Sequence, residues 1–379
     1  MARFMIPRDI YYGRGSLAQL RKLEGRRALI VGDGMSRESG FMQRAEGYLQ
    51  GAGLNVRSFI CARGGPTLTQ AQTGARAMQE FKPDWIVAVG SEGSVSAAKA
   101  MWIFYESPAT TPDALAHNGT LPKLRGLARL TAAPTGGGGE GALGGAAFLL
   151  DPAQGKRRLL LDPVLAPDIA IVDPDLAAVS PGPVLARGGM AALSQVLEAL
   201  SRGAGSFAQP LALRAARDIL AQLEAAVAGD VRARETLHEA QCMAGLVFAN
   251  APMGLCQALA ANTCAAFYKP LPTGIAESIF LPRALRWESG AKEMAAQVYT
   301  AAGLAGDPLP ALCARLETLR GQTGLPASFQ AFGIEEAEFL SKLPALSEQV
   351  SQDPIFSKTG RRPAPKETEN LLRGAYYGS

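Results

Sequence analysis

The sequence predicts an α/β N-terminal domain, with a doubly wound parallel sheet of the dinucleotide-binding type, and an all-α C-terminal domain. Up to about residue 176, short apolar runs alternate with helical segments, as in a parallel sheet covered by helices on both faces. Beyond that point the β-branched runs end, and long segments rich in alanine and leucine follow at helical spacing. A length of 379 residues also exceeds what one hydrophobic core usually holds.

We therefore expect two domains, at residues 1–176 and 180–379, joined by a hinge at residues 173–174 and 180–183. The cleft between two such domains is the usual place for a small-molecule substrate.

Composition excludes several classes of function. The formal charge of +4 is small and the basic residues are scattered, so no nucleic-acid partner is expected. The five cysteines are odd in number and lack CxxC spacing, which indicates neither a disulfide framework nor a zinc knuckle and favours a cytoplasmic location. No apolar run approaches the roughly 20 residues that span a bilayer, so no membrane partner is expected.

The first half of the chain is organised around residues 83–100. An apolar run from Trp85 to Val89 suits a strand buried on both faces, and alanines at helical spacing follow a turn that begins at Gly90. A helix that begins after such a turn directs unpaired N–H groups at an anion. Glu92 places a carboxylate where a pyrophosphate would lie.

The other expected elements of this half are an extended segment, several strands and helices, and a hairpin through Asp151 and Gly155. In order they cover residues 10–12 (extended), 17–23 (helix), 28–31 (strand), 42–50 (helix), 56–61 (strand), 127–133 (strand) and 167–174 (strand).

Two further segments are candidates for ligand contact. Asp33 follows the strand at residues 28–31 directly, so it either binds a ribose hydroxyl at the carboxyl end of the sheet or caps the next helix. Thr135 opens a glycine-rich loop that contains Gly138. Such a loop allows close approach of the backbone to a ligand, or is a flexible low-complexity connection.

Helical periodicity in the second half covers eight segments. They are residues 186–200, 211–227, 232–248, 255–264, 293–303, 309–323, 335–350 and 366–376.

Several short motifs occur in an order that resembles the iron-containing (group III) alcohol dehydrogenase family, a branch of the dehydroquinate-synthase-like superfamily. The resemblance spans essentially the whole chain, and it implies a homodimer. The motifs are Phe81-Lys82-Pro83-Asp84, Ala97-Ala98-Lys99, Pro134-Thr135, residues 167–176, residues 189–193, Glu198-Ala199, residues 248–254, Phe267-Tyr268 and Ala375-Tyr376.

In that family an aspartate and three histidines hold a divalent metal, and two pairs of ligands come from helices at i, i+4 spacing. The resemblance places Ala191 at the aspartate and Gln195 at its partner four residues on. The second pair falls on Gln257 and Ala261, of which only Gln257 stands where a ligating histidine would be, and Thr273 stands at the remaining histidine. Amide and hydroxyl oxygens are poor ligands for Fe²⁺ or Zn²⁺ compared with imidazole and carboxylate. No metal is therefore expected.

A cation or hydrogen-bond donor must then replace the metal's Lewis-acid role. The candidate catalytic residues are Gln195, Gln257, Lys269 and Thr273, although each of them could simply fill space.

The resemblance implies an NAD or NADP site that is weakened. Glu92 lies in the first phosphate turn, and Glu140 adds a second carboxylate in the glycine-rich loop. Two acids aimed at a diphosphate would cost on the order of 1 to 4 kcal/mol each. The candidate cofactor-binding residues are Asp33, Gly90, Ser91, Glu92, Gly93, Ser96, Thr135, Gly138 and Arg157.

Three functional hypotheses remain. The first is a divergent oxidoreductase that interconverts a small alcohol and an aldehyde or ketone with NAD(P), without the family metal. The second is a catalytically inactive paralogue that binds a metabolite or a partner protein. The third is an enzyme rebuilt for a cationic ligand, which Glu92 and Glu140 would bind.

Overall fold

The structure is a computed structural model that describes residues 3–61, 66–111, 115, 121–136, 142–151, 156–267, 271–303, 305–358 and 361–378. The chain divides into two compact units, unit 1 from Met1 to Ser180 and unit 2 from Pro181 to Ser379. The strands lie in unit 1, and in the described residues of unit 2 every regular element is helical.

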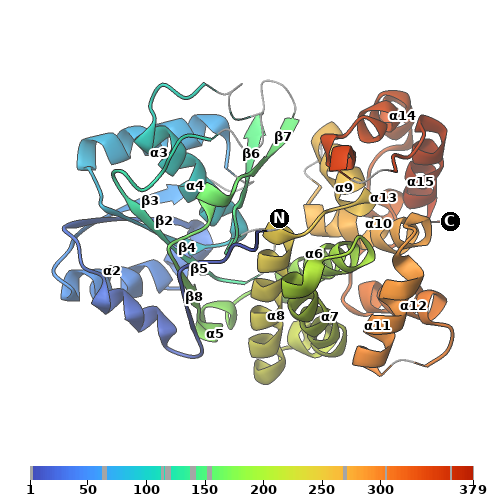
Figure 1. Cartoon of the computed structure of the whole chain (residues 1–379), viewed down its shortest axis with the longest axis horizontal. Helices are drawn as coiled ribbons and strands as arrows, with labels where there is room; N and C mark the ends of the chain where they lie inside the picture. Colours follow the sequence, from blue (N-terminus) through green and yellow to red (C-terminus); the bar gives the residue numbers. More distant parts are fainter. Residues whose placement is uncertain are drawn as a thin grey trace. The chain divides into compact units, whose positions relative to one another are not determined.

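Unit 1 contains a parallel sheet of six strands in the order β1-β8-β5-β4-β2-β3, which confirms the predicted fold class (Figure 1). Its strands are β1 (Asp9–Tyr12), β2 (Arg27–Asp33), β3 (Asn55–Cys61), β4 (Trp85–Gly90), β5 (Arg129–Pro134) and β8 (Ile169–Val172). The predicted hairpin is also present, as the antiparallel pair β6 (Ala146–Asp151) and β7 (Lys156–Leu161).

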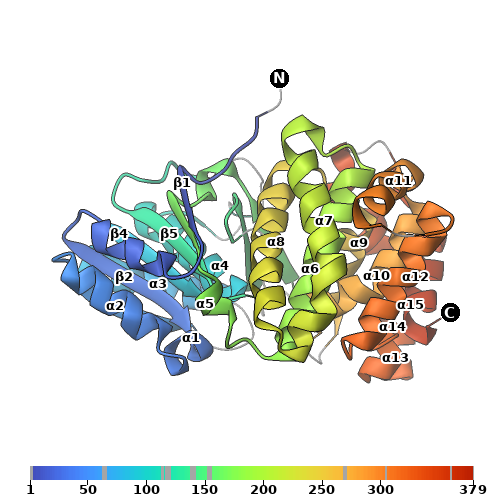
Figure 2. The same cartoon turned by 90° about the horizontal axis from the view of Figure 1, so that it is seen from below.

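Helices cover both faces of this sheet, as the fully buried strand β4 requires (Figure 2). On one face, the 3₁₀ helix η1 (Ser16–Lys22) and α2 (Phe41–Gly51) pack on residues such as Ile30, Val87 and Ile171. The other helices of unit 1 include α1 (Gly34–Glu38), α3 (Leu68–Phe81), α4 (Glu92–Glu106), η3 (Pro163–Leu165) and α5 (Pro174–Ala177). The predicted hinge at residues 173–174 is therefore the start of a short helix.

Unit 2 contains the predicted helices with somewhat longer bounds. They are α6 (Gly182–Ser201), α7 (Gly205–Ala228), α8 (Val231–Asn250), α9 (Leu255–Ala266), α11 (Ala291–Ala302), α12 (Pro308–Gln322), α14 (Glu336–Ser351) and α15 (Pro365–Tyr377), with the shorter α13 (Phe329–Phe332) and η4 (Pro354–Lys358) between them.

Periodicity assigns no helix to residues 273–287, and this is wrong, because α10 (Thr273–Trp287) runs through Pro282. A proline inside a helix removes the N–H bond to the carbonyl four residues earlier. Here that carbonyl belongs to Ser278, and it accepts a hydrogen bond from Arg320 Nη1 at 3.3 Å. A side chain from α12 thus replaces the bond that the proline removes.

No single helix among the described residues is long and apolar enough to cross a membrane. One pair of helices, α8 with α9, meets the length and composition test jointly, and the two are bent by 97°.

Candidate functional site

The carboxyl ends of β2 and β4 meet at the point where the order of the strands reverses. From β2 the chain proceeds outward to β3, and then returns to the other side of β2 as β4. Ligands of open α/β sheets bind at such a switch point. Asp33 ends β2 and Gly90 ends β4, so the structure places both predicted residues at this edge.

Asp33 is the N-cap of α1, which confirms the capping hypothesis. Its Oδ1 accepts the N–H of Ser36 at 2.8 Å, and its Oδ2 accepts the N–H of Ser91 and the hydroxyl of Ser94, both at 2.9 Å. Burial alone would raise the pKa of the Asp33 carboxyl, but these hydrogen bonds outweigh it and hold the pKa below its ordinary value. A role toward a ribose hydroxyl remains a prediction.

The turn between β4 and α4 requires glycine. A Cβ on Gly90 would lie 2.6 Å from Ser94 Oγ and 3.0 Å from Asp33 Oδ2. Ser91 is the N-cap of α4, and Glu92 and Gly93 lie half-buried in its first turn. The first turn of a helix offers N–H groups that can receive a phosphate. In this turn the N–H of Ser94 already donates to the carbonyl of Ser91 at 2.9 Å, and that of Ser91 donates to Asp33.

Glu92 interacts with a buried ammonium group. Lys99 lies two turns further along α4 and is fully buried, and its Nζ donates to the carbonyls of Gly144 at 2.6 Å and Ala146 at 2.8 Å. Burial lowers the pKa of Lys99 to about 7, whereas the charge of Glu92 acts in the opposite direction. Part of the Glu92 charge is thus balanced inside unit 1.

The other predicted cofactor-binding residues have different surroundings from one another. Ser96 is a structural group, since its Oγ accepts the N–H of Phe148 at 3.1 Å. Thr135 is buried at the end of β5, and its hydroxyl has no hydrogen-bond partner in the described part of the chain. Arg157 belongs to β7, but its side chain lies outside the described residues, as do Gly138 and Glu140.

In unit 2 the two predicted glutamines are buried without partners. Gln195 on α6 is 0% exposed and Gln257 on α9 is 2% exposed. Neither side-chain amide has a hydrogen-bond partner among the described residues. Thr273 begins α10, and the next residue, Gly274, packs against the carbonyl of Arg187 on α6. Lys269 lies outside the described residues.

Three side chains hold the first turn of α9, and thereby Gln257. Glu198 accepts the N–H of Cys256 at 2.5 Å with one oxygen and that of Gln257 at 3.1 Å with the other. Glu288 accepts the N–H of Leu255 at 3.3 Å, and Arg202 binds both of its oxygens. We call Glu198, Glu288 and Arg202 the α9 clamp.

The α9 clamp buries two carboxyl groups, Glu198 and Glu288, that interact with each other. Burial, followed by the nearby Glu288 carboxylate, raises the pKa of Glu198 to about 8. The sequence showed Glu198 only as part of a family motif. Glu288, Arg202 and Ser94 were not predicted, because their partners are distant in sequence and no local pattern marks them.

The donor set of unit 2 does not fit the metal that the family resemblance implies. Ala191 and Ala261 offer no donor atom, and Gln195, Gln257 and Thr273 offer only neutral oxygens. Within the described ranges, no group of three or more His, Cys, Asp or Glu side chains could hold a metal ion. Neutral oxygens alone are a weak set for Fe²⁺ or Zn²⁺.

Comparison with known proteins agrees with the architecture over both units. The model of the iron-containing alcohol dehydrogenase family matches residues 7–174, and that of the C-terminal domain of the same family matches residues 185–376. The structure of an iron-containing alcohol dehydrogenase from Thermococcus thioreducens aligns with a TM-score of 0.90 and 27% identity, covering 100% of both chains.

Two curated relatives extend this likeness. An NADPH-dependent butanol dehydrogenase of Clostridium saccharobutylicum is 35% identical, over 100% of this chain and 99% of that protein. A bifunctional aldehyde-alcohol dehydrogenase of Escherichia coli is 31% identical, over 98% of this chain and 46% of that protein. The chain belongs to the iron-containing alcohol dehydrogenase family.

Proposed function

We propose that this protein is an NAD(P)-linked oxidoreductase that interconverts a small alcohol and the corresponding aldehyde or ketone. The observation that carries the proposal is the edge formed by Asp33, Gly90 and the first turn of α4 at the switch point of the sheet. The full-length likeness to an NADPH-dependent butanol dehydrogenase supports it and favours NADPH.

The proposed site holds the nucleotide through unit 1. Gly90 lets the backbone approach a phosphate. The buried hydroxyl of Thr135 has no hydrogen-bond partner among the described residues, and a ligand could supply one. Glu92 weakens this site, but less than an isolated carboxylate would, because its charge also acts on Lys99. A nicotinamide nucleotide held there would supply or accept the hydride.

In the proposed site, Gln195 and Gln257 replace the Lewis acid. Their side-chain N–H groups donate to the carbonyl oxygen, on which negative charge develops as hydride arrives. The α9 clamp orients Gln257 by fixing the first turn of its helix. Conversion of the resulting alkoxide into the alcohol requires a proton, for which Thr273 and Lys269 are the candidate donors.

This proposal includes the absence of a stoichiometric metal at the family position. Metal analysis of protein purified without chelator should find no Fe or Zn in a one-to-one ratio, and chelator should leave the melting temperature unchanged. One tightly bound Fe or Zn per chain that is lost in Gln257→Ala would contradict it.

The activity is tested by NADPH- and NADH-dependent reduction of butanal without added metal. Gln195→Ala and Gln257→Ala should each lower kcat at least about tenfold, since loss of one oxyanion donor commonly costs this much or more. Gln209→Ala is the matched control, because Gln209 is half-buried and its side chain donates to the exposed Gln297.

A nucleotide-binding but inactive paralogue is the second candidate, favoured by the four non-ligating positions. Tight NADPH binding with no turnover of short aldehydes or ketones would support the inactive paralogue over the oxidoreductase.

A homodimer remains part of the proposal, and light scattering of the purified chain would test it.

A further inference from the structure

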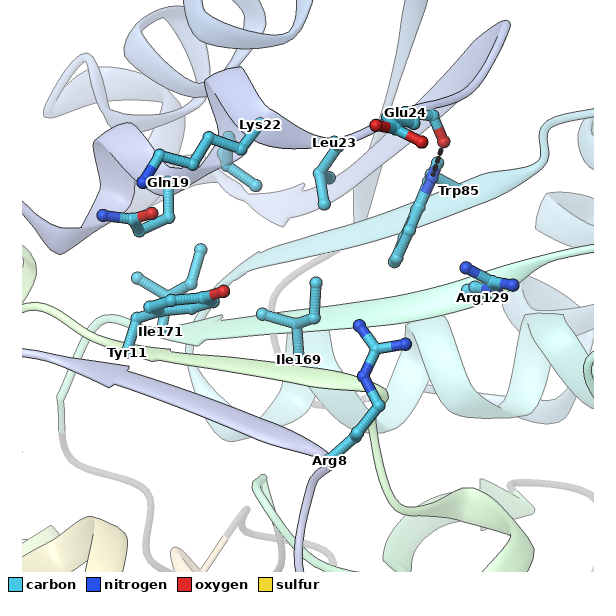
Figure 3. Close-up of a pocket in the computed structure, with 11 residues that line it drawn as sticks. Arg8, Tyr11, Gln19, Lys22, Leu23, Glu24, Trp85, Arg129, Ile169 and Ile171 are labelled. Carbon is cyan, nitrogen blue, oxygen red and sulfur yellow. Dashed lines mark hydrogen bonds between the residues drawn. The ribbon is translucent and has the colours of Figure 1, made fainter.

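A pocket of about 210 Å³ opens in unit 1 at the amino ends of the sheet strands (Figure 3). Trp85 and Arg129 are the first residues of β4 and β5, and Ile169 is the first residue of β8. The nucleotide edge described above lies at the opposite, carboxyl ends. A strand of six residues separates the two edges by roughly 20 Å, so the pocket is a separate place.

The floor and one wall of the pocket are apolar and rigid. Ile169 and Ile171 are 6% and 1% exposed, and Trp85 is 4% exposed. The indole N–H of Trp85 donates to the backbone carbonyl of Glu24 at 3.0 Å, which fixes the plane of the ring. A flat apolar group could therefore stack or pack here without reorganising the site.

The rim is predominantly basic. Three cationic side chains, Arg8, Lys22 and Arg129, line the pocket with a single acid, Glu24. Arg129 lies over the Trp85 ring, with 5.8 Å between its guanidinium carbon and the ring centroid. Figure 3 shows the guanidinium groups of Arg8 and Arg129 on the Trp85 side of the pocket, with Lys22 at the other end beside Gln19.

These features define the chemistry of a ligand. Guanidinium groups match the two oxygens of a carboxylate, while Glu24 disfavours a second negative charge on the ligand. Arg8 also pairs with Asp9 at 2.8 Å, which further limits the positive charge of the rim. A cavity of about 150 Å³ holds a benzene ring, so this pocket has room for one ring and a carboxylate.

We propose that this pocket binds a small monoanionic carboxylate with a flat apolar body, through Arg8 and Arg129 above the Trp85 and Ile169 surface. This site is independent of the proposed oxidoreductase function, because none of its residues belongs to the nucleotide edge or to the glutamine pair.

The test is a ¹⁹F NMR titration of the full chain with 4-fluorobenzoate in excess NADPH, compared with the neutral 4-fluorobenzamide. We expect the benzoate to bind at least about tenfold more tightly than the amide, and Arg8→Gln or Arg129→Gln to weaken it about tenfold. Arg57→Gln is the control, since Arg57 stacks in the same way on Phe81 outside the pocket.

Further variants test separately the charge of the side chain, the planar geometry of the guanidinium group and the location of the ligand. Arg129→Lys should retain part of the affinity, because it keeps the charge and loses the planar fork. Equal binding of benzoate and benzamide, or unchanged binding in both Arg8→Gln and Arg129→Gln, would overturn the proposal. Loss of benzoate binding in Gln195→Ala would also overturn it, because the ligand would then occupy unit 2.

Discussion

Replacement of Gly254 by alanine should disrupt the α9 clamp. A Cβ at this position would lie 2.6 Å from Glu288 Oε1 and 2.8 Å from Glu198 Oε1. Ordinary contact begins near 3.4 Å, so these oxygens must retreat by 0.8 and 0.6 Å, the differences 3.4 − 2.6 and 3.4 − 2.8. Neither carboxylate is free to do so, because Arg202 holds Glu288 and two backbone N–H groups hold Glu198.

The expected cost follows from the hydrogen bonds that lengthen. The two oxygens concerned accept the N–H groups of Cys256 and Leu255. A hydrogen bond to a charged group contributes about 1.5 to 3 kcal/mol, and one to a neutral group, as Glu198 largely is with a pKa of about 8, contributes about 0.5 to 1.5 kcal/mol. Weakening both without complete loss should lower the free energy of unfolding by about 2 to 4 kcal/mol. For a unit of this size that corresponds to a fall in Tm of roughly 4 to 16 °C.

Thermal and urea unfolding followed by far-UV circular dichroism would measure this change. Gly47→Ala is the matched control, since Gly47 lies in α2 with no atom within 4 Å of its added Cβ, and it should stabilise by up to about 1 kcal/mol. The kcat for aldehyde reduction should fall in Gly254→Ala alone, because Gln257 would move. A Gly254→Ala protein within about 0.5 kcal/mol of wild type would refute the proposed rigidity of the clamp.

Three further predictions concern other parts of the chain. Glu92→Gly should increase the affinity for NADPH by no more than about tenfold, as measured by calorimetry, because Lys99 already offsets part of the repulsion between Glu92 and the phosphates. A hundredfold gain in affinity would contradict this role of Lys99. His238→Leu should stabilise the protein by about 1 to 3 kcal/mol, since His238 is 2% exposed and neither ring nitrogen has a partner within the described residues. Burial lowers the pKa of His238 to about 4, whereas the unfolded chain protonates this residue near pH 6.5. The protein therefore keeps its full stability above about pH 6.5 and loses part of it as the pH falls from 6.5 through 4. Urea titrations should show less acid destabilisation in His238→Leu than in wild type, and identical pH profiles would exclude His238 as a source of the acid destabilisation. Gly274→Ala should be more damaging than Gly254→Ala, because its Cβ would lie 2.3 Å from the backbone carbonyl oxygen of Arg187, and a soluble variant with wild-type Tm would contradict that close contact.

The sequence by itself determined the two-part organisation and most of the elements. Apolar runs such as residues 85–90 have no polar face, so only a strand covered on both sides accommodates them. Alanine- and leucine-rich periodicity located α6 and α8 in the same way. The residue types at positions 195, 257 and 273 also led, before any geometry, to the prediction that the family's metal ligands are missing, which stays a prediction.

Only the tertiary structure decided how polar groups are satisfied, because their partners are remote in sequence. α10 continues through Pro282, and Arg320, 42 residues beyond Ser278, bonds the carbonyl that the proline leaves. Asp33 bonds Ser91 from 58 residues away, so this carboxylate caps α1 and also joins it to the start of α4. A buried polar group must find a partner wherever the fold places one, and sequence periodicity reports only which face is buried.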